Sequence, residues 1–202
     1  MTPLPASSPS SVPSTSFGAA MPYKIAVLVY IFDDAGKLLL LHRRKPPNKD
    51  LYSPIGGKLE QAMGESPYAC ALREIQEEVG VALGMEDIRL LGIVSERAYP
   101  RSAVAGQEGA QAPAGHWLMF CFEVTKRLNF PARQMDEGRL EWVDVEAMLG
   151  LDIPKTDREV IWPLVVEHSA ALGGKRAEGY FSVHIDCRDE NHFAVTHEYP
   201  LT

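Results

Sequence analysis

One amphipathic helix constrains this chain more than any other segment. Ser66 is a good N-cap, Pro67 suits the first helical position and Gly80 suits a stop, which predicts a helix over residues 67–79. Four apolar side chains share an arc of about 60° on it: Tyr68, Leu72, Ile75 and Val79. An apolar stripe of this kind needs a partner surface, so we expect the helix to pack on a β-sheet.

Three carboxylates crowd the opposite face of this helix. Glu74, Glu77 and Glu78 fall within an arc of about 100°, and we expect them to point outward. Like charges three and four residues apart repel one another, so the arrangement costs stability unless a cation lies beside it. The helix alone leaves two interpretations open: a solvated acidic stripe, or the ligands of a cation.

The rest of the sequence alternates between strand and helix patterns. Strands are predicted at 23–32, 37–44, 88–96, 116–124, 139–145, 179–186 and 194–199. The first two strands flank a DDAG turn and are expected to form a hairpin, as are the last two. A second helix is predicted over 156–170, ended or kinked by Pro163. This order predicts an α+β fold, with a mixed β-sheet packed between helices in an α/β/α sandwich.

Composition and charge exclude some classes of function and indicate a cellular compartment. The 202 residues carry a formal net charge of −7, which argues against binding nucleic acid or a membrane surface through broad electrostatics. No stretch approaches the about 20 apolar residues that span a bilayer. Three widely separated cysteines, Cys70, Cys121 and Cys187, are expected to be free thiols in a reducing compartment, which favours a cytoplasmic protein.

Two segments lie outside the expected packed elements. Residues 1–20 are rich in Ser, Pro and Ala and are expected to form a disordered tail, which leaves 21–202 as a single domain. Residues 101–114 form a long connection rich in Ala, Gly and Gln, interpreted either as a functional loop or as a disordered one.

The segment GGKLEQAMGESPYACALREIQEEVGV, residues 56–81, resembles the Nudix box of the Nudix hydrolase family. The family pattern is G-x5-E-x7-R-E-U-x-E-E-x-G-U, where U is a bulky apolar residue. From Glu65 to Val81 the match is complete. Upstream, seven residues rather than five separate Gly57 from Glu65, and the extra two lie within 61–63. The resemblance implies a Nudix-type fold and leaves the exact position of the glycine turn open.

The resemblance also gives the acidic face a role. In the family, water attacks a nucleoside diphosphate linked to another group and cleaves the pyrophosphate with the help of Mg²⁺, for which Mn²⁺ can substitute. By motif position, the metal ligands are expected to be the Gly56 carbonyl, Glu77 and Glu78, with Glu74 as a further ligand or the general base. The catalytic arrangement is expected to include an Arg73–Glu65 ion pair that braces the site. Magnesium prefers oxygen ligands, which fits this set.

Candidates outside the motif are weaker. Family members supply another carboxylate from a later loop, and Glu137 is the first candidate for it here, with Asp136 and Glu141 as competitors and a solvated turn as the plain alternative.

Basic residues are candidates for phosphate contacts. Arg43 and Arg44 follow the second strand, and Lys58 follows the paired glycines. An exposed basic loop is the simpler account of residues 42–45.

The substrate class rests on a second, looser similarity. The region around Trp142 and Asp144 is similar to family members that hydrolyse purine nucleoside triphosphates, including oxidised ones, to a monophosphate and pyrophosphate. There, residues of this region approach the base, although a core role for Trp142 is the simpler account. ADP-ribose and dinucleoside polyphosphates stay open as substrates, as does a Nudix nucleotide-binding protein without activity. The expected partner is a small nucleotide, and a homodimer is compatible with the family.

Overall fold

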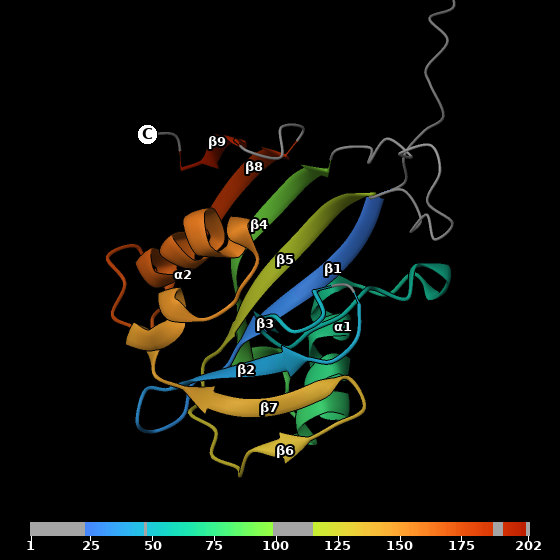
Figure 1. Ribbon diagram of the computed structural model, residues 1–202, viewed down its shortest axis with the longest axis vertical. Helices are drawn as coiled ribbons and strands as arrows, with labels where there is room; N and C mark the ends of the chain where they lie inside the picture. The colour runs from blue at the N-terminus through green and yellow to red at the C-terminus, as the bar shows by residue number, and fades with distance from the viewer. Residues whose placement is uncertain (1–22, 47, 99–114, 188–191, 201–202) are drawn as a thin grey trace, which may run out of the picture.

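The computed structural model describes residues 23–46, 48–98, 115–187 and 192–200 (Figure 1). The predicted tail, residues 1–20, and the connection 101–114 lie outside these ranges. The larger of two sheets is mixed and has the order β1-β5-β4-β8-β9. Its strands are β1 Tyr23–Tyr30, β5 His116–Val124, β4 Ile88–Ala98, β8 Phe181–Cys187 and β9 Ala194–Tyr199. The smaller sheet, β3-β2-β7-β6, is antiparallel and consists of β3 Tyr52–Ser53, β2 Leu38–Arg43, β7 Gly138–Val143 and β6 Arg133–Gln134.

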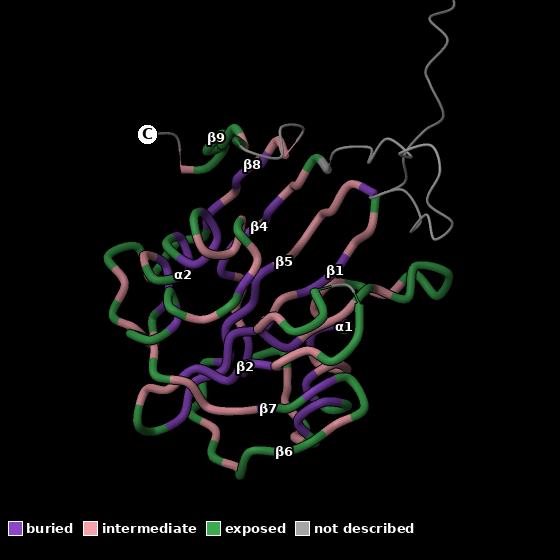
Figure 2. The backbone as a smooth tube through the Cα atoms, in the orientation of Figure 1, coloured by how far each residue is buried: buried purple, intermediate pink, exposed green. Residues whose placement is uncertain are grey.

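Strand β1 is buried on both faces, which explains its almost continuous apolar sequence. Val27 and Val29 belong to the core beneath the acidic helix. Tyr30 belongs to a second core on the other side, where it stacks on Trp162 at 6.3 Å between ring centroids. The centre of the molecule in Figure 2 is accordingly buried along β1, β5 and β2, whereas β9 is exposed. Strand β1 therefore divides the interior into two apolar layers.

The predicted first hairpin forms only at its turn. The amide of Asp33 donates to the Lys37 carbonyl at 3.0 Å, and the amide of Leu39 donates to the Ile31 carbonyl at 2.9 Å. Beyond this point the two strands separate, since β1 pairs with β5 in parallel and β2 pairs with β7 and β3. Both strands are buried on two faces, so each needs its own covering layers, which one two-stranded ribbon cannot provide.

The other predicted elements are present with small changes. The predicted α+β class is confirmed, although the mixed sheet is accompanied by a second sheet. The last hairpin forms from β8 and β9. The two-residue strands β3 and β6 were not predicted, because such short segments carry no periodicity. No helix among the described residues is long and apolar enough to cross a bilayer.

Two helical layers cover the larger sheet. The acidic helix consists of α1, Pro67–Glu74, and a π-helical segment, Ile75–Val79, which together match the predicted 67–79. The Ser66 hydroxyl accepts a hydrogen bond from the Ala69 amide at 3.2 Å, as an N-cap does. On the other side, a π-helical segment, Asp157–Ile161, leads into α2, Trp162–His168, whose second residue is Pro163. The proline thus marks the change of helix type within the predicted helix.

A buried glutamate anchors the end of α2 to the sheet. Glu123 of β5 is 1% exposed. It accepts hydrogen bonds from the Arg89 guanidinium at 2.8 Å, from the amides of Ala170 and Ala171 at 3.2 Å, and from the Ser169 hydroxyl. If Glu123 were replaced, each of these donors would lose its charged acceptor. Glu123 is therefore required to hold the end of α2 against the sheet.

We predict that Glu123→Gln lowers the free energy of unfolding by about 3 kcal/mol, because the Arg89 guanidinium loses its buried counter-charge. Urea unfolding followed by circular dichroism measures this loss. Glu86→Gln, at an exposed position of the 3₁₀ helix Met85–Asp87 before β4, is the matched control and is expected to change stability by less than about 0.5 kcal/mol. Equal unfolding midpoints for the two variants would contradict the assignment.

Candidate active site

The paired glycines lie between β1 and the acidic helix. Residues 55–59 run antiparallel to β1, with Val29 donating to the Ile55 carbonyl and Val27 to the Gly57 carbonyl, both at 2.9 Å. A Cβ on Gly56 would lie 2.2 Å from the Val27 carbonyl oxygen, and one on Gly57 would lie 2.1 Å from Glu74 Oε1. Gly56 also has a φ of 139°, which side chains rarely adopt. Only glycine fits at position 56, whereas a side chain at position 57 would have to displace the Glu74 carboxylate.

The two extra residues before Glu65 lie in an exposed turn. A 3₁₀ helix, Gln61–Met63, contains no buried residue, and Gly64 closes it with a φ of 67°. The Glu65 carboxylate accepts from the Glu60 amide at 2.7 Å across the turn. The insertion is therefore absorbed at the surface, and the glycines keep their position against β1.

Arg73 holds the acidic helix to this segment. Its guanidinium donates to both oxygens of Glu65, at 2.8 and 3.1 Å, and to the Lys58 carbonyl at 3.2 Å. The hydrogen bonds from Arg73 hold the pKa of Glu65 down at about 2. The same guanidinium also donates to Glu74 at 2.7 Å and to Glu77 at 3.1 Å. The pair expected from the motif is thus present, and its arginine bridges three carboxylates.

The expectation that all three helical carboxylates point outward is wrong for two of them. The side chain of Glu77 is 57% exposed, but that of Glu74 is 12% exposed and Glu78 is 5% exposed. The reason is tertiary: the segment around Gly57 packs against this face and encloses it. Glu78 Oε2 is buried without a hydrogen-bond partner.

The electrostatics of this cluster fit a cation. Burial, together with the charges of Glu74 and Glu137, raises the pKa of Glu78 to about 8, against a hydrogen bond from the Gly56 backbone. Burial also raises the pKa of Glu74. Among the described residues, no three His, Cys, Asp or Glu side chains form a ready group for a metal ion, and Arg73 donates to both Glu74 and Glu77. The orphaned oxygen of Glu78 and the all-oxygen donor set nevertheless match what Mg²⁺ requires.

Of the three later carboxylates, Glu137 is the one at the site. It lines the same cavity as Glu74, and its carboxylate is 4.0 Å from the Arg43 guanidinium. Glu141 instead accepts a hydrogen bond from the Tyr52 hydroxyl at 3.0 Å, and Asp136 is exposed outside the cavity lining.

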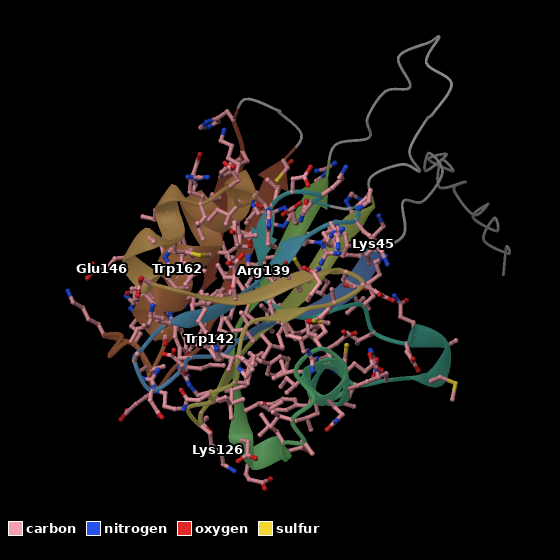
Figure 3. All side chains as sticks on the ribbon, turned by 60° about the horizontal axis from the view of Figure 1, so that its bottom comes forward. Lys45, Lys126, Arg139, Trp142, Glu146 and Trp162 are labelled. Atoms are coloured by element: carbon pink, nitrogen blue, oxygen red, sulfur yellow. The ribbon has the colours of Figure 1, made fainter. Side chains whose placement is uncertain are left out.

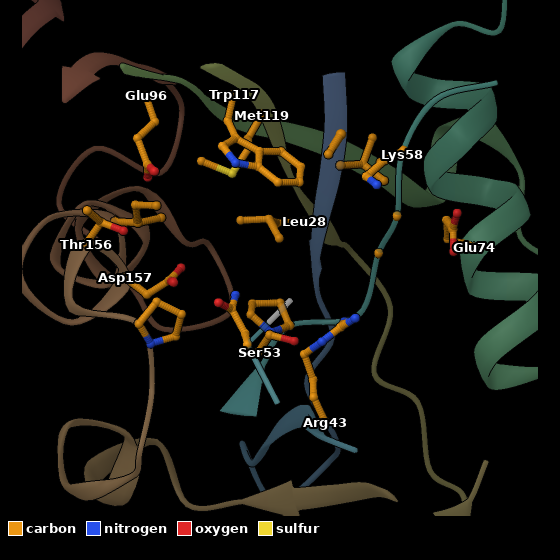
Figure 4. Close-up of a pocket in the computed structure, with 18 of the residues that line it drawn as sticks. Leu28, Arg43, Ser53, Lys58, Glu74, Glu96, Trp117, Met119, Thr156 and Asp157 are labelled. Atoms are coloured by element: carbon orange, nitrogen blue, oxygen red, sulfur yellow. The ribbon is translucent and has the colours of Figure 1, made fainter. Parts of the chain in front are cut away.

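A cavity of about 500 Å³ begins at these carboxylates and runs across the larger sheet (Figure 4). Arg43 and Lys58 line it near Glu74. Leu28, Trp117 and Met119 line its middle. Glu96, Thr156 and Asp157 lie at the end away from Glu74. One end of the cavity therefore has both acidic and basic side chains, its middle is apolar and aromatic, and its other end is acidic.

Three of the predicted substrate contacts lie elsewhere. Trp142 on β7 packs on Phe130 at 4.9 Å between ring centroids, and its indole N–H donates to the Phe130 carbonyl at 2.8 Å (Figure 3). Asp144 is 3.3 Å from Lys37 in an exposed ion pair. Arg44 is exposed, and its amide donates to the Glu137 carbonyl at 2.8 Å. Trp142 is thus held in the core by its own hydrogen bond, and the structure does not bring these residues to the cavity.

Trp117 lines the cavity and Trp142 does not, which agrees with the core role that was the simpler account of Trp142. Trp117 lies on β5, with the Lys24 ammonium 5.2 Å and the Lys58 ammonium 6.0 Å from the ring centroid. The sequence contained one signal for it, the alternation of β5, which places Trp117 and Met119 on the same face. Glu96 and Asp157 had no such signal, because an isolated acid in a strand or helix usually faces solvent.

Comparisons with known proteins agree with this geometry. The NUDIX domain profile matches residues 22–162. A MutT protein from Bacillus halodurans has 22% identity and a TM-score of 0.61, over 87% of this chain and 97% of its own. The NUDIX domain of Shewanella oneidensis NrtR, solved with ADP ribose, has 17% identity and a TM-score of 0.53, over 79% and 94%. The E. coli dihydroneopterin triphosphate pyrophosphohydrolase has 22% identity and a TM-score of 0.51, over 71% and 97%.

At these identities the solved structures show a shared fold and no shared substrate. The profile match, in contrast, covers well over half of the chain and contains the complete motif from Glu65 to Val81. The chain therefore belongs to the Nudix family.

Proposed function

We propose that this protein is a metal-dependent pyrophosphohydrolase that converts purine nucleoside triphosphates, or their oxidised forms, to a monophosphate and pyrophosphate. One observation carries the proposal: a single cavity connects the carboxylates of Glu74 and Glu137, which act electrostatically on the buried Glu78, to an apolar chamber beside Trp117. A triphosphate and a heterocyclic base are the two parts of one ligand that such a cavity suits.

The metal would be held by oxygen atoms of the acidic helix and its neighbours. Glu78 and Glu74 are the first ligands we propose, with Glu77, Glu137 and the Gly56 carbonyl completing the set. When bound, Mg²⁺, or Mn²⁺ in its place, supplies positive charge to the phosphate oxygens and makes a nearby water easier to deprotonate.

The chain's own residues position the phosphates and accept the proton. Lys58 and Arg43 lie beside the carboxylates and offer N–H donors to phosphate oxygens. Arg73 and Glu65 lock the helix and the glycine segment together, so the ligands cannot drift apart. Glu74 is either a ligand or the general base, and its place against Gly57 brings it to the reacting end of the cavity in both roles.

The middle of the cavity suits a planar base. Trp117 presents an indole face, and Leu28 and Met119 add apolar surface. Aromatic stacking contributes about 1–3 kcal/mol per base in nucleotide sites. We therefore assign the base contact to Trp117 and not to Trp142. We also propose that residues 21–202 form one Nudix domain, that the protein is cytoplasmic and that it forms a homodimer.

Other ligands give the competing functions. The NrtR domain was solved with ADP ribose, and the E. coli neighbour is a dihydroneopterin triphosphate pyrophosphohydrolase, so both chemistries belong in any substrate test. A binding protein without activity is disfavoured, because Arg73, Glu74, Glu77 and Glu78 are all retained. The net charge of −7 likewise favours a small nucleotide over nucleic acid.

We predict that Glu78→Gln lowers turnover or metal affinity by about tenfold to a hundredfold, because a metal ligand loses its charge. Turnover measured against Mg²⁺ concentration separates the two effects. Glu60→Gln, in the exposed turn, is the matched control and is expected to behave as wild type. Equal curves for both variants would mean that the carboxylates do not bind metal.

The same variant has a second readout in the metal-free protein. The raised pKa of Glu78 means that the unfolded chain loses this proton first, so stability falls as pH rises from about 4.5 to about 8. Glu78→Gln is expected to remove this loss and to be at least as stable as wild type at pH 8.

We predict that excess EDTA abolishes turnover and that added Mg²⁺ or Mn²⁺ restores it. The rate should rise toward alkaline pH, because the attacking water must lose a proton. Pyrophosphate release in a metal titration at several pH values tests both statements. Full turnover in EDTA would rule out the metal-dependent mechanism.

We predict that purine nucleoside triphosphates, or oxidised ones, have the highest kcat/KM in a nucleotide panel. The panel includes ADP-ribose, dinucleoside polyphosphates and dihydroneopterin triphosphate, with separate detection of phosphate and pyrophosphate. A kcat/KM for ADP-ribose or a dinucleoside polyphosphate that is much higher than for every triphosphate would overturn the substrate assignment.

A further inference from the structure

The end of the cavity away from the metal site is closed by two acids. Glu96 extends from β4 and Asp157 from the π-helical segment before α2, with Thr156 between them (Figure 4). Both carboxylates are directed into the cavity, across its apolar middle from Glu74 (Figure 4). A ligand whose phosphates lie at Glu74 therefore meets this pair with the far side of its base.

The two acids differ in their hydrogen bonding. The Thr156 hydroxyl donates to Glu96, which favours the ionised form of that carboxylate, although burial raises its pKa. Burial raises the pKa of Asp157 to about 7, and the charge of Glu96 contributes. Near neutral pH, Glu96 is the better acceptor and Asp157 is the group that holds a proton.

The ionisable groups that face Glu96 and Asp157 bring no charge that balances these two acids. Tyr30 of β1 and Cys121 of β5 face Asp157, and Cys187 of β8 faces Glu96. The pKa of each of these three groups is raised, so they stay neutral near pH 7.

The nearby charged side chains are engaged elsewhere. Arg97 is 3.8 Å from Asp186, and the Lys155 ammonium is 5.1 Å from the Phe193 ring centroid.

We propose that Glu96 and Asp157 recognise a 2-amino-lactam edge, the feature shared by guanine, oxidised guanine and pterins. The ring N–H and the 2-amino group donate to the Glu96 carboxylate, and the Asp157 carboxylic acid donates to the ring carbonyl. This inference rests on the proposed function, because it assumes that the phosphates lie at the metal end of the same cavity.

Other bases match this end less well. Adenine offers an amino donor and a ring nitrogen acceptor, so it gives the Glu96 carboxylate one donor where guanine gives two. Hypoxanthine keeps the lactam but lacks the amino group. Leaving a buried acceptor without its donor is costly, so a site with two such acids discriminates strongly between these edges.

The test measures binding of monophosphates, which contain no pyrophosphate to cleave and so report on recognition without turnover. Calorimetry at pH 6.5 and pH 8.5 compares GMP, IMP, AMP and a pterin monophosphate, in the presence of Mg²⁺. At pH 6.5 the wild type is expected to bind GMP or the pterin at least about tenfold more tightly than IMP and AMP. At pH 8.5 the preference over AMP should shrink by about tenfold, because ionised Asp157 repels the ring carbonyl of GMP but can accept from the amino group of AMP. The preference over IMP, which has the same carbonyl, should persist.

Two variants assign the roles. Asp157→Asn keeps an N–H donor at every pH, so its preference is expected to be the same at pH 6.5 and pH 8.5. Glu96→Gln loses the double acceptor, so GMP and IMP should bind within about twofold of each other at both pH values. Asp152→Asn, an exposed neighbour outside the cavity lining, is the matched control and should keep the wild-type profile.

The outcomes separate this inference from the proposed function. Tighter binding of the pterin than of GMP supports the shared edge and identifies the pterin as its source. A GMP or pterin preference with no triphosphate turnover would overturn the hydrolase and leave the recognition intact. Wild-type binding of AMP as tight as that of GMP would overturn the inference without any variant, as would wild-type pH profiles in both variants.

Discussion

The close approach of the glycine segment to β1 and to the acidic helix is the contact on which the site depends. A Cβ at Gly56 would meet the Val27 backbone, and one at Gly57 would meet Glu74. Because both neighbours are that close, the carboxylate face of the helix is enclosed and Glu78 is buried. Arg73 secures the same contact by donating to Glu65 and to the Lys58 carbonyl. The crowding that costs the helix stability by itself thus becomes a confined set of carboxylate oxygens, which we propose as metal ligands.

The second constraint is the division of the interior by β1 and its neighbours. Val27 and Val29 of β1 enter the core under the acidic helix, while the alternate residues Leu28 and Tyr30 face the core under α2. The cavity lies on the α2 side of this boundary, where Leu28, Trp117 and Met119 line it. The proposed metal ligands of the acidic helix come from the opposite helical layer and meet the cavity at the edge of β1, where residues 55–59 pair with the strand. The site therefore requires both the layer of the acidic helix and the layer of α2.

Much of this could be predicted from the sequence, and particular residues show the limit. Helix 67–79 and its capping by Ser66 follow from local spacing, because neighbours in a helix are neighbours in space. The Arg73–Glu65 pair was expected only from the resemblance of the motif, and the structure contains it. The choice of Glu137 over Asp136 and Glu141 does not follow, since all three lie close together in the sequence and only their strand contacts separate them. Trp142 shows the same limit more clearly. Its strand was predicted, but which layer its ring entered depended on Phe130, a residue from an irregular segment.

By itself, the sequence determined the family, the acidic helix and the oxygen chemistry of one end of the site. These properties depend on residue order at short range, where helix geometry converts spacing directly into a shared face. Only the tertiary structure decided that Glu78 is buried with its Oε2 atom unpartnered, and that Trp117 and not Trp142 lines the cavity. It also decided that Glu96 and Asp157, 61 positions apart, face each other. The physical reason is that burial and the distance between charges depend on how the layers pack. The sequence of a single strand or helix does not specify which surface packs against it.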